Sequence, residues 1–424
     1  MAVKVVVVGG GSTYTPELIE GFADRDAVLH VEDLVLLDVD RDRLDVVGGL
    51  ARRMLERRGW PGRLSLTTGQ DGAFEGADFV LLQIRVGGQG TRFVDETLPH
   101  RFGCIGQETT GPGGFAKALR TVPVVLDIAE AATRRAAPGA WIIDFTNPVG
   151  IVTQALVDGG FRAIGLCNVA IGMQRTFARR FGVEPERVEL EHVGLNHLSW
   201  ERAIRVDGTD VLPGLLESDG PWLADMVSLP EELVRALRSV PSYYLRYFYM
   251  TDVVLAEQLA GKSRAEDVMA IERDLLERYR DPALAEKPRQ LEERGGAFYS
   301  EAAAQLIAAL ATDAGDVQVV NLRNGGAIPG LPADEIVEIG AHVGRDGVVP
   351  IPVAPLGPEL LGLVLQLKAY ERLTIQAALS GDREMALLAL LANPLVARYS
   401  TAAPLLDALL DANRRFLPRF FPEA

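Results

Sequence analysis

A valine run followed at once by three glycines constrains the fold of this chain more than any other stretch. Residues 5–8 are consecutive valines, which is typical of a strand buried on both faces. At residues 9–11 the glycine backbone can turn tightly and approach a ligand closely. Thr15 is then expected to cap a helix that has Pro16 at its first position. Such a strand, turn and helix N-terminus offer free amides and a positive dipole end to an anion.

The glycine turn is expected to bind the pyrophosphate of a dinucleotide, although a tight turn of this kind can also bind nothing. Gly9 and Gly11 match only two of the three glycines of G-x-G-x-x-G, so the motif alone is weak. A second predicted strand ends at Asp38, where dinucleotide folds hydrogen-bond the adenosine ribose; Asp40 is the second candidate. A carboxylate there repels the 2′-phosphate of NADP and so favours NAD. The predicted cofactor-binding residues are Gly9, Gly11, Ser12, Thr13 and Asp38.

Apolar strands alternate with helices up to about residue 170. Together with the first two strands, predicted strands at residues 64–66, 77–83, 141–145 and 163–166 make six. This order predicts an α/β fold whose N-terminal half is a Rossmann-like, doubly wound parallel sheet. The rest of the chain is expected to be mixed and mostly helical. We therefore expect a cofactor domain at residues 1–170 and a substrate, metal and oligomerisation domain at residues 171–424.

Two segments carry unusually many reactive side chains. Residues 85–114 are polar and glycine-rich, and are expected to form a long functional loop at the carboxyl edge of the sheet. Residues 241–259 are expected to form one helix that carries several tyrosines, for which packing is the more common role. A periodic helix is predicted to begin at Arg264, after Ser263 as its N-cap.

Composition narrows the functional class. The chain of 424 residues is too long for one ordinary core, which favours two domains. Its net charge of -15 argues against nucleic acid and anionic membranes as partners. No signal peptide or membrane-length apolar run is evident, and two cysteines make no disulfide framework, so a cytoplasmic protein is expected.

Cys167 and His197 each follow a predicted strand, and a thiolate and an imidazole can share a divalent cation. Two protein ligands suit a cation whose remaining positions are filled by substrate oxygens. For this pair alone, a buried thiol and a hydrogen-bonded core histidine are the better interpretation, because the spacing fits no structural zinc pattern. Arg85, Arg92 and Arg264 could bind an anion, although each alone is more simply a surface charge.

Taken together, these residues resemble one family, the NAD- and metal-dependent family-4 glycoside hydrolases, and within it the 6-phospho-β-glucosidase branch. The resemblance runs nearly end to end. Its motifs, in chain order, are GGGSTYTPE at residues 9–17, GQETTGPGG at 106–114, TNP at 146–148, GLCN at 165–168, GLNH at 194–197, YLRYFY at 244–249, SR at 263–264 and RGG at 294–296.

The resemblance implies hydrolysis of 6-phospho-β-glucosides by an elimination that depends on a transient oxidation. NAD accepts a hydride from C3 of the sugar, and a divalent metal, typically manganese, polarises the C2 and C3 oxygens. A tyrosine removes the C2 proton, the C1–O bond breaks, water adds and the hydride returns. The family is a known exception to the two-carboxylate scheme of glycosidases.

The resemblance also assigns roles to residues of this chain. Cys167 and His197 become the metal ligands, Tyr244 becomes the base and Glu108 becomes the acidic residue that assists Tyr244. The implied substrate-binding residues are Arg92, Asn147 and Arg264, with Arg85 as a further candidate. Asn168 occupies the position where α-specific relatives carry an aspartate as general acid, and since an asparagine cannot donate a proton in that way, the β-specific branch is favoured.

Two other functions are open at this point. An NAD-dependent hydroxy-acid dehydrogenase of the lactate/malate type has the same expected fold, and would produce NADH that accumulates. A regulatory protein that binds NAD without turnover is the third class. The expected partner is a small 6-phospho-sugar glycoside, and the expected assembly is a homodimer or homotetramer.

Overall fold

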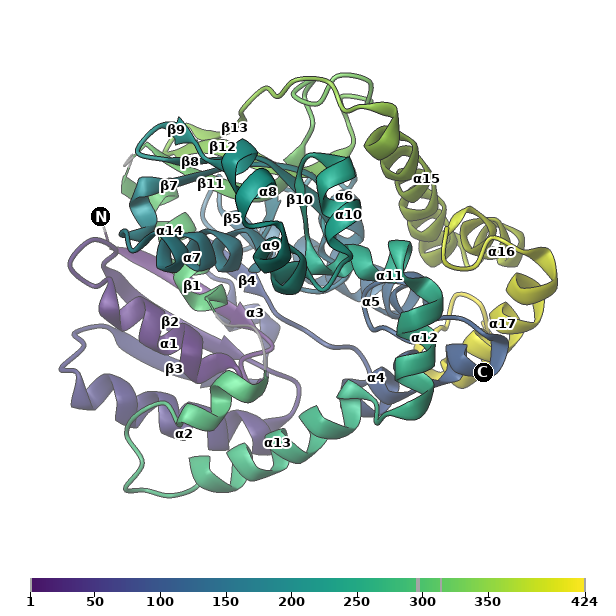
Figure 1. Ribbon diagram of the computed structural model, residues 1–424. Coiled ribbons are helices and arrows are strands. Elements are labelled where there is room, and N and C mark those ends of the chain that lie inside the picture. Colours follow the sequence, from purple (N-terminus) through teal and green to yellow (C-terminus); the bar gives the residue numbers. More distant parts are fainter. Residues whose placement is uncertain (1, 295–297, 313–314, 423–424) are drawn as a thin grey trace.

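One mixed sheet runs through the whole molecule (Figure 1). The computed structural model describes residues 2–294, 298–312 and 315–422. Within these ranges the strand order is β10-β8-β7-β12-β11-β6-β5-β4-β1-β2-β3, with β13 paired to β12 and β9 paired to β8.

The first half of the chain supplies six parallel strands in the order β3-β2-β1-β4-β5-β6. They are β1 (Val3–Val8), β2 (Val31–Leu37), β3 (Arg63–Thr67), β4 (Phe79–Leu82), β5 (Trp141–Asp144) and β6 (Ala163–Gly165). The order reverses between β1 and β4, which is the switch point where doubly wound sheets bind ligands at the carboxyl ends of their strands. The predicted Rossmann-like sheet is confirmed.

Helices cover this half of the sheet: α1 (Thr15–Asp24), α2 (Arg41–Arg57), α3 (Gln70–Ala73), α4 (Gly88–Thr97), the 3-10 helix η1 (Leu98–Phe102), α5 (Gly111–Thr133), α6 (Val149–Asp158) and α7 (Val169–Phe181). Two local predictions are wrong. The segment expected to be a loop at 85–114 contains α4 and η1. Thr15 does not cap α1, because it is the first residue of the helix and its buried hydroxyl accepts a hydrogen bond from Gln83 Nε2 (2.9 Å).

The second half extends the same sheet with antiparallel strands: β7 (Val188–Leu195), β8 (Leu198–Val206), β9 (Thr209–Asp210), β10 (Val240–Pro241), β11 (Asp316–Arg323), β12 (Ile336–Gly344) and β13 (Gly347–Pro350). β11 joins the parallel half where Asn321 pairs with Gly165 of β6. A Cβ atom on Gly165 would lie 2.9 Å from Cβ of Asn321, so this junction requires the glycine. The division of the chain near residue 170 stays a prediction.

The helices of the second half are η2 (Pro185–Arg187), α8 (Leu212–Ser218), α9 (Gly220–Val227), α10 (Glu231–Leu237), η3 (Tyr243–Leu245), α11 (Arg246–Tyr249), α12 (Thr251–Ala260), α13 (Arg264–Tyr279), η4 (Arg289–Arg294), α14 (Tyr299–Thr312), α15 (Pro358–Ser380), α16 (Arg383–Ala392), α17 (Tyr399–Ala412) and η5 (Arg414–Phe416). The single helix expected at 241–259 is wrong, since η3, α11 and α12 divide it. The capped helix after Ser263 is confirmed, with a complete capping box to Glu266. Across the described ranges, no helix combines the length and apolar character needed to cross a membrane.

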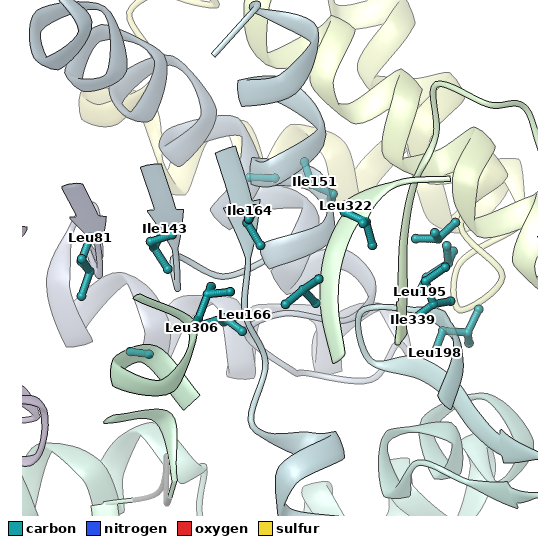
Figure 2. Packing of buried hydrophobic residues seen from close by; sticks show 14 of the residues in the cluster. Leu81, Ile143, Ile151, Ile164, Leu166, Leu195, Leu198, Leu306, Leu322 and Ile339 are labelled. Carbon is teal, nitrogen blue, oxygen red and sulfur yellow. The ribbon is translucent and has the colours of Figure 1, made fainter. Parts of the chain in front are cut away.

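A continuous apolar core joins the two halves of the sheet. Figure 2 shows Leu81, Ile143 and Ile164 on successive parallel strands, with Leu322 and Ile339 continuing the row on the antiparallel strands. Helices of the second half also pack on the first half, and α13 lies beside α2 (Figure 1). Arg53 of α2 fixes this contact by donating to the carbonyls of Leu284 (2.6 Å) and Tyr279 (2.7 Å). Helix α13 also reaches the glycine turn, where the hydroxyl of Tyr279 donates to the carbonyl of Thr13 (2.8 Å).

Candidate active site

A cleft of about 1820 Å³ lies at the carboxyl ends of the parallel strands. The predicted site residues that line it are Gly9, Gly11, Ser12, Asp38, Arg85, Arg92, Glu108, Asn147, Asn168, Tyr244 and Arg264. Three predicted residues, Thr13, Cys167 and His197, are instead buried beside it, with exposed fractions of 0%, 6% and 6%. One continuous space thus touches both the glycine turn and the predicted substrate residues.

The glycine turn is held directly against Asp38. The amide of Gly11 donates to Asp38 Oδ2 (2.8 Å), and the amide of Asp40 donates to Asp38 Oδ1 (3.0 Å). A Cβ atom on Gly11 would lie 2.9 Å from the same carboxylate oxygen, so no side chain fits there. Asp40, the second candidate for the ribose, instead caps α2 by accepting from the amide of Arg43 (3.0 Å). The geometry therefore favours Asp38 as the acidic residue at the cofactor end.

A second carboxylate, Glu272 of α13, lies under the glycine turn and was missed from the sequence. It accepts hydrogen bonds from Thr13 Oγ1 (3.2 Å), Gln89 Nε2 (3.0 Å) and Arg294 Nη2 (2.9 Å). Burial raises the pKa of Glu272, but the positive charges of Arg294 and Arg43 outweigh burial and lower it. The hydroxyl of Thr13 thus donates to a protein carboxylate and does not face the cleft. Gly295 and Gly296 of the RGG motif lie outside the described residues.

Cys167 and His197 come together at the junction of the two sheet halves. Cys167 follows β6, and His197 lies in the two-residue turn between β7 and β8, where Leu195 pairs with Leu198. The side chain of Asn196, adjacent to His197, hydrogen-bonds Cys167. His197 has φ 63°, a left-handed conformation that costs about 1–3 kcal/mol for a residue other than glycine. Strain of this kind is typical of functional sites.

Only one member of this pair is in its metal-binding state in the protein alone, because a metal binds a neutral imidazole and a thiolate but not a thiol. Burial raises the pKa of the Cys167 thiol to about 12, and nearby Glu338 adds to the rise. Burial lowers the pKa of His197 to about 4, so its imidazole is neutral at pH 7. No cluster of three or more potential ligands among histidine, cysteine, aspartate and glutamate occurs in the described chain. One sulfur and one imidazole nitrogen fit a divalent transition metal only when a bound substrate supplies further oxygens.

Tyr244 covers His197. The two rings stack with centroids 3.6 Å apart and an angle of 7° between their planes, and the ring of Tyr243 lies 4.2 Å from that of Tyr244. Burial raises the pKa of Tyr244 well above its ordinary value, and Tyr243 and Cys167 add to the rise. The phenol is therefore protonated in the protein alone. It could act as a base only with a positive charge close by, which a cation at Cys167 and His197 would supply.

Glu108 is the centre of a buried group of cations. Its carboxylate contacts Arg85, Lys117 Nζ (2.9 Å) and Arg92 Nη2 (3.3 Å). Burial raises the pKa of Glu108, but the charges of Arg85, Lys117 and Arg92 outweigh it and hold the pKa well below the usual range. Lys117 was missed from the sequence, where it lies within the apolar stretch that forms α5. Burial, helped by Arg85, lowers the pKa of Lys117 to about 7.

The remaining cations lie where α4 meets the start of α13. Arg92 Nε donates to Glu96 (2.7 Å), and the other oxygen of Glu96 accepts from the amide of Ala265 (2.7 Å). This link places Arg264, the first residue of α13, near Arg92 at the cleft. Arg264 itself donates to the carbonyl of Glu293 (2.5 Å). Guanidinium groups at one wall of a cleft suit an anionic group such as a phosphate.

Asn147 completes the polar lining. It follows β5 at the carboxyl edge of the sheet and lines the cleft. Its Oδ1 atom is buried and has no hydrogen-bond partner among the described residues. Leaving a buried acceptor without a donor is costly, about 1–3 kcal/mol, so this atom is suited to a hydroxyl group of a bound ligand.

Comparisons with known proteins agree on one family. A family model described as family 4 glycosyl hydrolase matches residues 4–183, and its C-terminal domain model matches residues 192–396. A Bacillus subtilis protein named probable 6-phospho-beta-glucosidase is 42% identical over 99% of this chain and 98% of its own length.

Solved structures give the same result. The 6-phospho-beta glucosidase from Thermotoga maritima, determined with NAD and glucose-6-phosphate, is 36% identical with a TM-score of 0.92, covering 98% of this chain and 99% of that one. A form of it with manganese, NAD+ and glucose-6-phosphate is 35% identical with a TM-score of 0.90, covering 97% and 99%. Cryptosporidium parvum malate dehydrogenase, at 14% identity, a TM-score of 0.56 and coverage of 90% and 100%, shares the fold alone.

Proposed function

This chain belongs to family 4 of the glycosyl hydrolases, and from that premise we propose that it hydrolyses 6-phospho-β-glucosides with NAD and a divalent cation, Mn²⁺ above all. The observation that carries the proposal is the shared cleft. It touches the glycine turn and Asp38 at one end, and Tyr244, Asn147 and the Glu108 cations at the other. A dinucleotide and a sugar phosphate can therefore lie end to end in one space.

Each group of residues has a task in this reaction. The glycine turn at Gly9, Gly11 and Ser12 lets the pyrophosphate approach the N-terminus of α1, and Asp38 accepts the hydroxyls of the adenosine ribose. Arg92 and Arg264 bind the 6-phosphate, with Arg85 held close to them by Glu108. Asn147 binds a sugar hydroxyl through its buried Oδ1. Thr13, being fully buried, supports the turn by its hydrogen bond to Glu272.

The reacting carbons lie next to Tyr244 and His197. When bound, NAD supplies a reversible hydride acceptor for C3, and a cation held by Cys167 and His197 supplies a Lewis acid that acidifies C2. Tyr244, whose ring stacks directly on that of His197, would remove the C2 proton, and a cation held by His197 would lower the pKa of its phenol. Glu108, an anion in this structure, cannot donate a proton; it assists by fixing the surrounding cations. Asn168 lines the cleft without an acidic proton, which favours β-glycosides.

The test is release of nitrophenol from p-nitrophenyl 6-phospho-β-glucoside. We expect release that requires both NAD and Mn²⁺, stops with a chelator, and leaves no NADH. The unphosphorylated glucoside and the 6-phospho-α-glucoside are the matched controls, and both should react far more slowly. Stoichiometric NADH formed from a hydroxy acid, with no effect of a chelator, would instead indicate a hydroxy-acid dehydrogenase. Binding of NAD without any release of nitrophenol would indicate a protein without turnover.

The chain acts in the cytoplasm as a homodimer or homotetramer under this proposal. Large apolar side chains on its surface support self-association, among them Leu259 of α12 and Tyr399 of α17, with exposed fractions of 60% and 68%. Light scattering coupled to size-exclusion chromatography tests the assembly, and a mass of 45.9 kDa at micromolar concentration would contradict it.

A further inference from the structure

The imidazole of His197 has a hydrogen-bond partner that, like His197 itself, does not line the main cleft. Thr109 Oγ1 lies 3.0 Å from His197 Nδ1. Thr109 belongs to the GQETTGPGG segment directly before α5, far from His197 in sequence. Both residues line the same small cavity, which shares no residue with the main cleft and also touches Asn196 and Tyr370. This contact has no role in the reaction described above.

The direction of the bond follows from the neighbours of Thr109. Its hydroxyl also lies 2.8 Å from Gln107 Oε1. That oxygen accepts from two backbone amides as well, those of Thr109 and Thr110, each at 2.6 Å. Because amide N–H groups can only donate, the Gln107 atom at this position is an oxygen and not the NH₂ nitrogen. The single hydroxyl hydrogen of Thr109 therefore points to Gln107.

A hydroxyl that donates to Gln107 can offer only its lone pairs to His197. Nδ1 of His197 must then carry the hydrogen, and in a neutral imidazole Nε2 holds the lone pair that binds metals. The ring plane is fixed independently, because Tyr244 stacks on one face at 3.6 Å. The left-handed backbone of His197, with φ 63°, fixes the direction in which its side chain leaves the main chain. The tautomer and the orientation of His197 are thus both determined before any ligand arrives.

We propose that Gln107 and Thr109 form a positioning pair that holds His197 as its Nδ1–H tautomer, with Nε2 presented to the divalent cation. The pair acts through His197 and does not touch the substrate. It also accounts for two glycines of the motif. A Cβ atom on Gly113 would lie 2.3 Å from the carbonyl of Gln107, and one on Gly114 would lie 2.3 Å from the carbonyl of Thr109. These glycines let the segment approach α5 closely enough to reach His197.

The inference rests on the proposed metal site, so the experiment reads the tautomer separately from the metal. Protein labelled with ¹⁵N-histidine contains five histidines, and a His197→Gln variant identifies the His197 signals. We expect ring ¹⁵N shifts of the Nδ1–H form in the wild type. In Thr109→Val, which keeps the shape of the side chain and removes the hydroxyl, the signals should move toward the Nε2–H form.

Metal affinity is the second measurement, made on the same proteins with Mn²⁺ by electron paramagnetic resonance in the presence of NAD and glucose 6-phosphate. Partners of this kind typically change metal affinity 10–100-fold, so Thr109→Val should weaken Mn²⁺ binding by about that factor. Thr109→Ser, which restores a hydroxyl, should bind within about threefold of the wild type, as should the control Thr110→Val. The hydroxyl of Thr110 does not cap α5, and this neighbouring residue is buried whereas Thr109 is half-buried.

The outcomes separate this inference from the proposed function. NAD affinity in Thr109→Val should match the wild type, which shows that the variant is folded. Retention of the Nδ1–H form, or an unchanged Mn²⁺ dissociation constant, in a folded Thr109→Val protein overturns the positioning pair. A wild type that binds no Mn²⁺ refutes the metal site of the proposed function instead, and the tautomer spectra then decide on the pair alone.

Discussion

Replacing Glu108 by glutamine tests the charge balance on which the substrate end of the cleft depends. The substitution keeps the shape of the side chain and removes one negative charge from among three cations. Arg85 loses the carboxylate with which it is paired, Lys117 loses its contact at 2.9 Å and Arg92 loses its contact at 3.3 Å. Arg92 keeps its bond to Glu96 at 2.7 Å, so Arg85 and Lys117 suffer most.

The magnitude follows from how each cation can respond. Breaking a buried ion pair from one side typically costs about 3–5 kcal/mol of folding free energy. Arg85 cannot release its proton, whereas Lys117, whose pKa is about 7, can. Without Glu108 the pKa of Lys117 falls further, so the lysine becomes neutral at pH 7. The loss of folding free energy is then near the lower end of this range, about 3 kcal/mol. At pH 6 the wild-type lysine is charged and stabilised by Glu108, so the loss should be larger than at pH 8.

The assay is urea unfolding of wild type and Glu108→Gln at pH 6, 7 and 8, followed by far-ultraviolet circular dichroism. Glu130→Gln is the matched control, since Glu130 is 67% exposed and forms its ion pair with Arg134 one helical turn away. The control should change stability by less than about 0.5 kcal/mol. A Glu108→Gln protein that resembles the control, or one that loses more stability at pH 8 than at pH 6, would refute the reasoning.

Three further predictions concern the cofactor turn, the buried lysine and the base. Asp38→Ala should weaken NAD binding about 10–100-fold, because the variant loses the expected hydrogen bonds to the ribose and the bond to Gly11. An unchanged dissociation constant for NAD in a fluorescence titration would exclude Asp38 from the ribose site. Between pH 7.5 and 8.5 the folded protein holds Lys117 mostly neutral, whereas the unfolded lysine, with a pKa of about 10.4, is charged. The unfolded state therefore binds more protons, and this group makes the free energy of unfolding rise by about 1.4 kcal/mol per pH unit. Lys117→Met should remove that rise in urea unfolding, and equal slopes for both proteins would contradict the lowered pKa. Tyr244→Phe should reduce kcat about 10²–10⁴-fold while NAD and Mn²⁺ affinities stay within about threefold, and a smaller loss of kcat would assign the base to another group.

The cofactor end of the molecule could be predicted from sequence because its physics is local. A buried strand, a glycine turn and a helix start follow one another within a few residues. The contact of Asp38 with the turn follows from its position after the second strand, while its role toward the ribose stays a prediction. The same locality explains the success at Ser263, whose capping box involves only neighbours along the chain. Thr15 was misjudged because its hydroxyl is engaged by Gln83, a residue on another strand.

The substrate end was harder to predict because its contacts are distant in sequence. Gly87, Gly88 and Gly90 conceal α4, since glycine weakens every local helix signal. Glu272 reaches Thr13 across more than two hundred residues, and Lys117 becomes an active-site cation only through its contact with Glu108. The one sequence signal for Lys117 was its position inside an apolar helix, because a buried lysine needs a charged partner. Only the family resemblance proposed Cys167 and His197 as metal ligands, which stays a prediction; their residue types and spacing alone favoured a structural role.

The most direct test of the account is the isotope content of the product formed in D₂O. If Tyr244 removes the C2 proton while the ring is briefly oxidised, glucose 6-phosphate released from a 6-phospho-β-glucoside should carry deuterium at C2, as read by proton magnetic resonance. Product that forms at the normal rate with hydrogen retained at C2 would contradict the account.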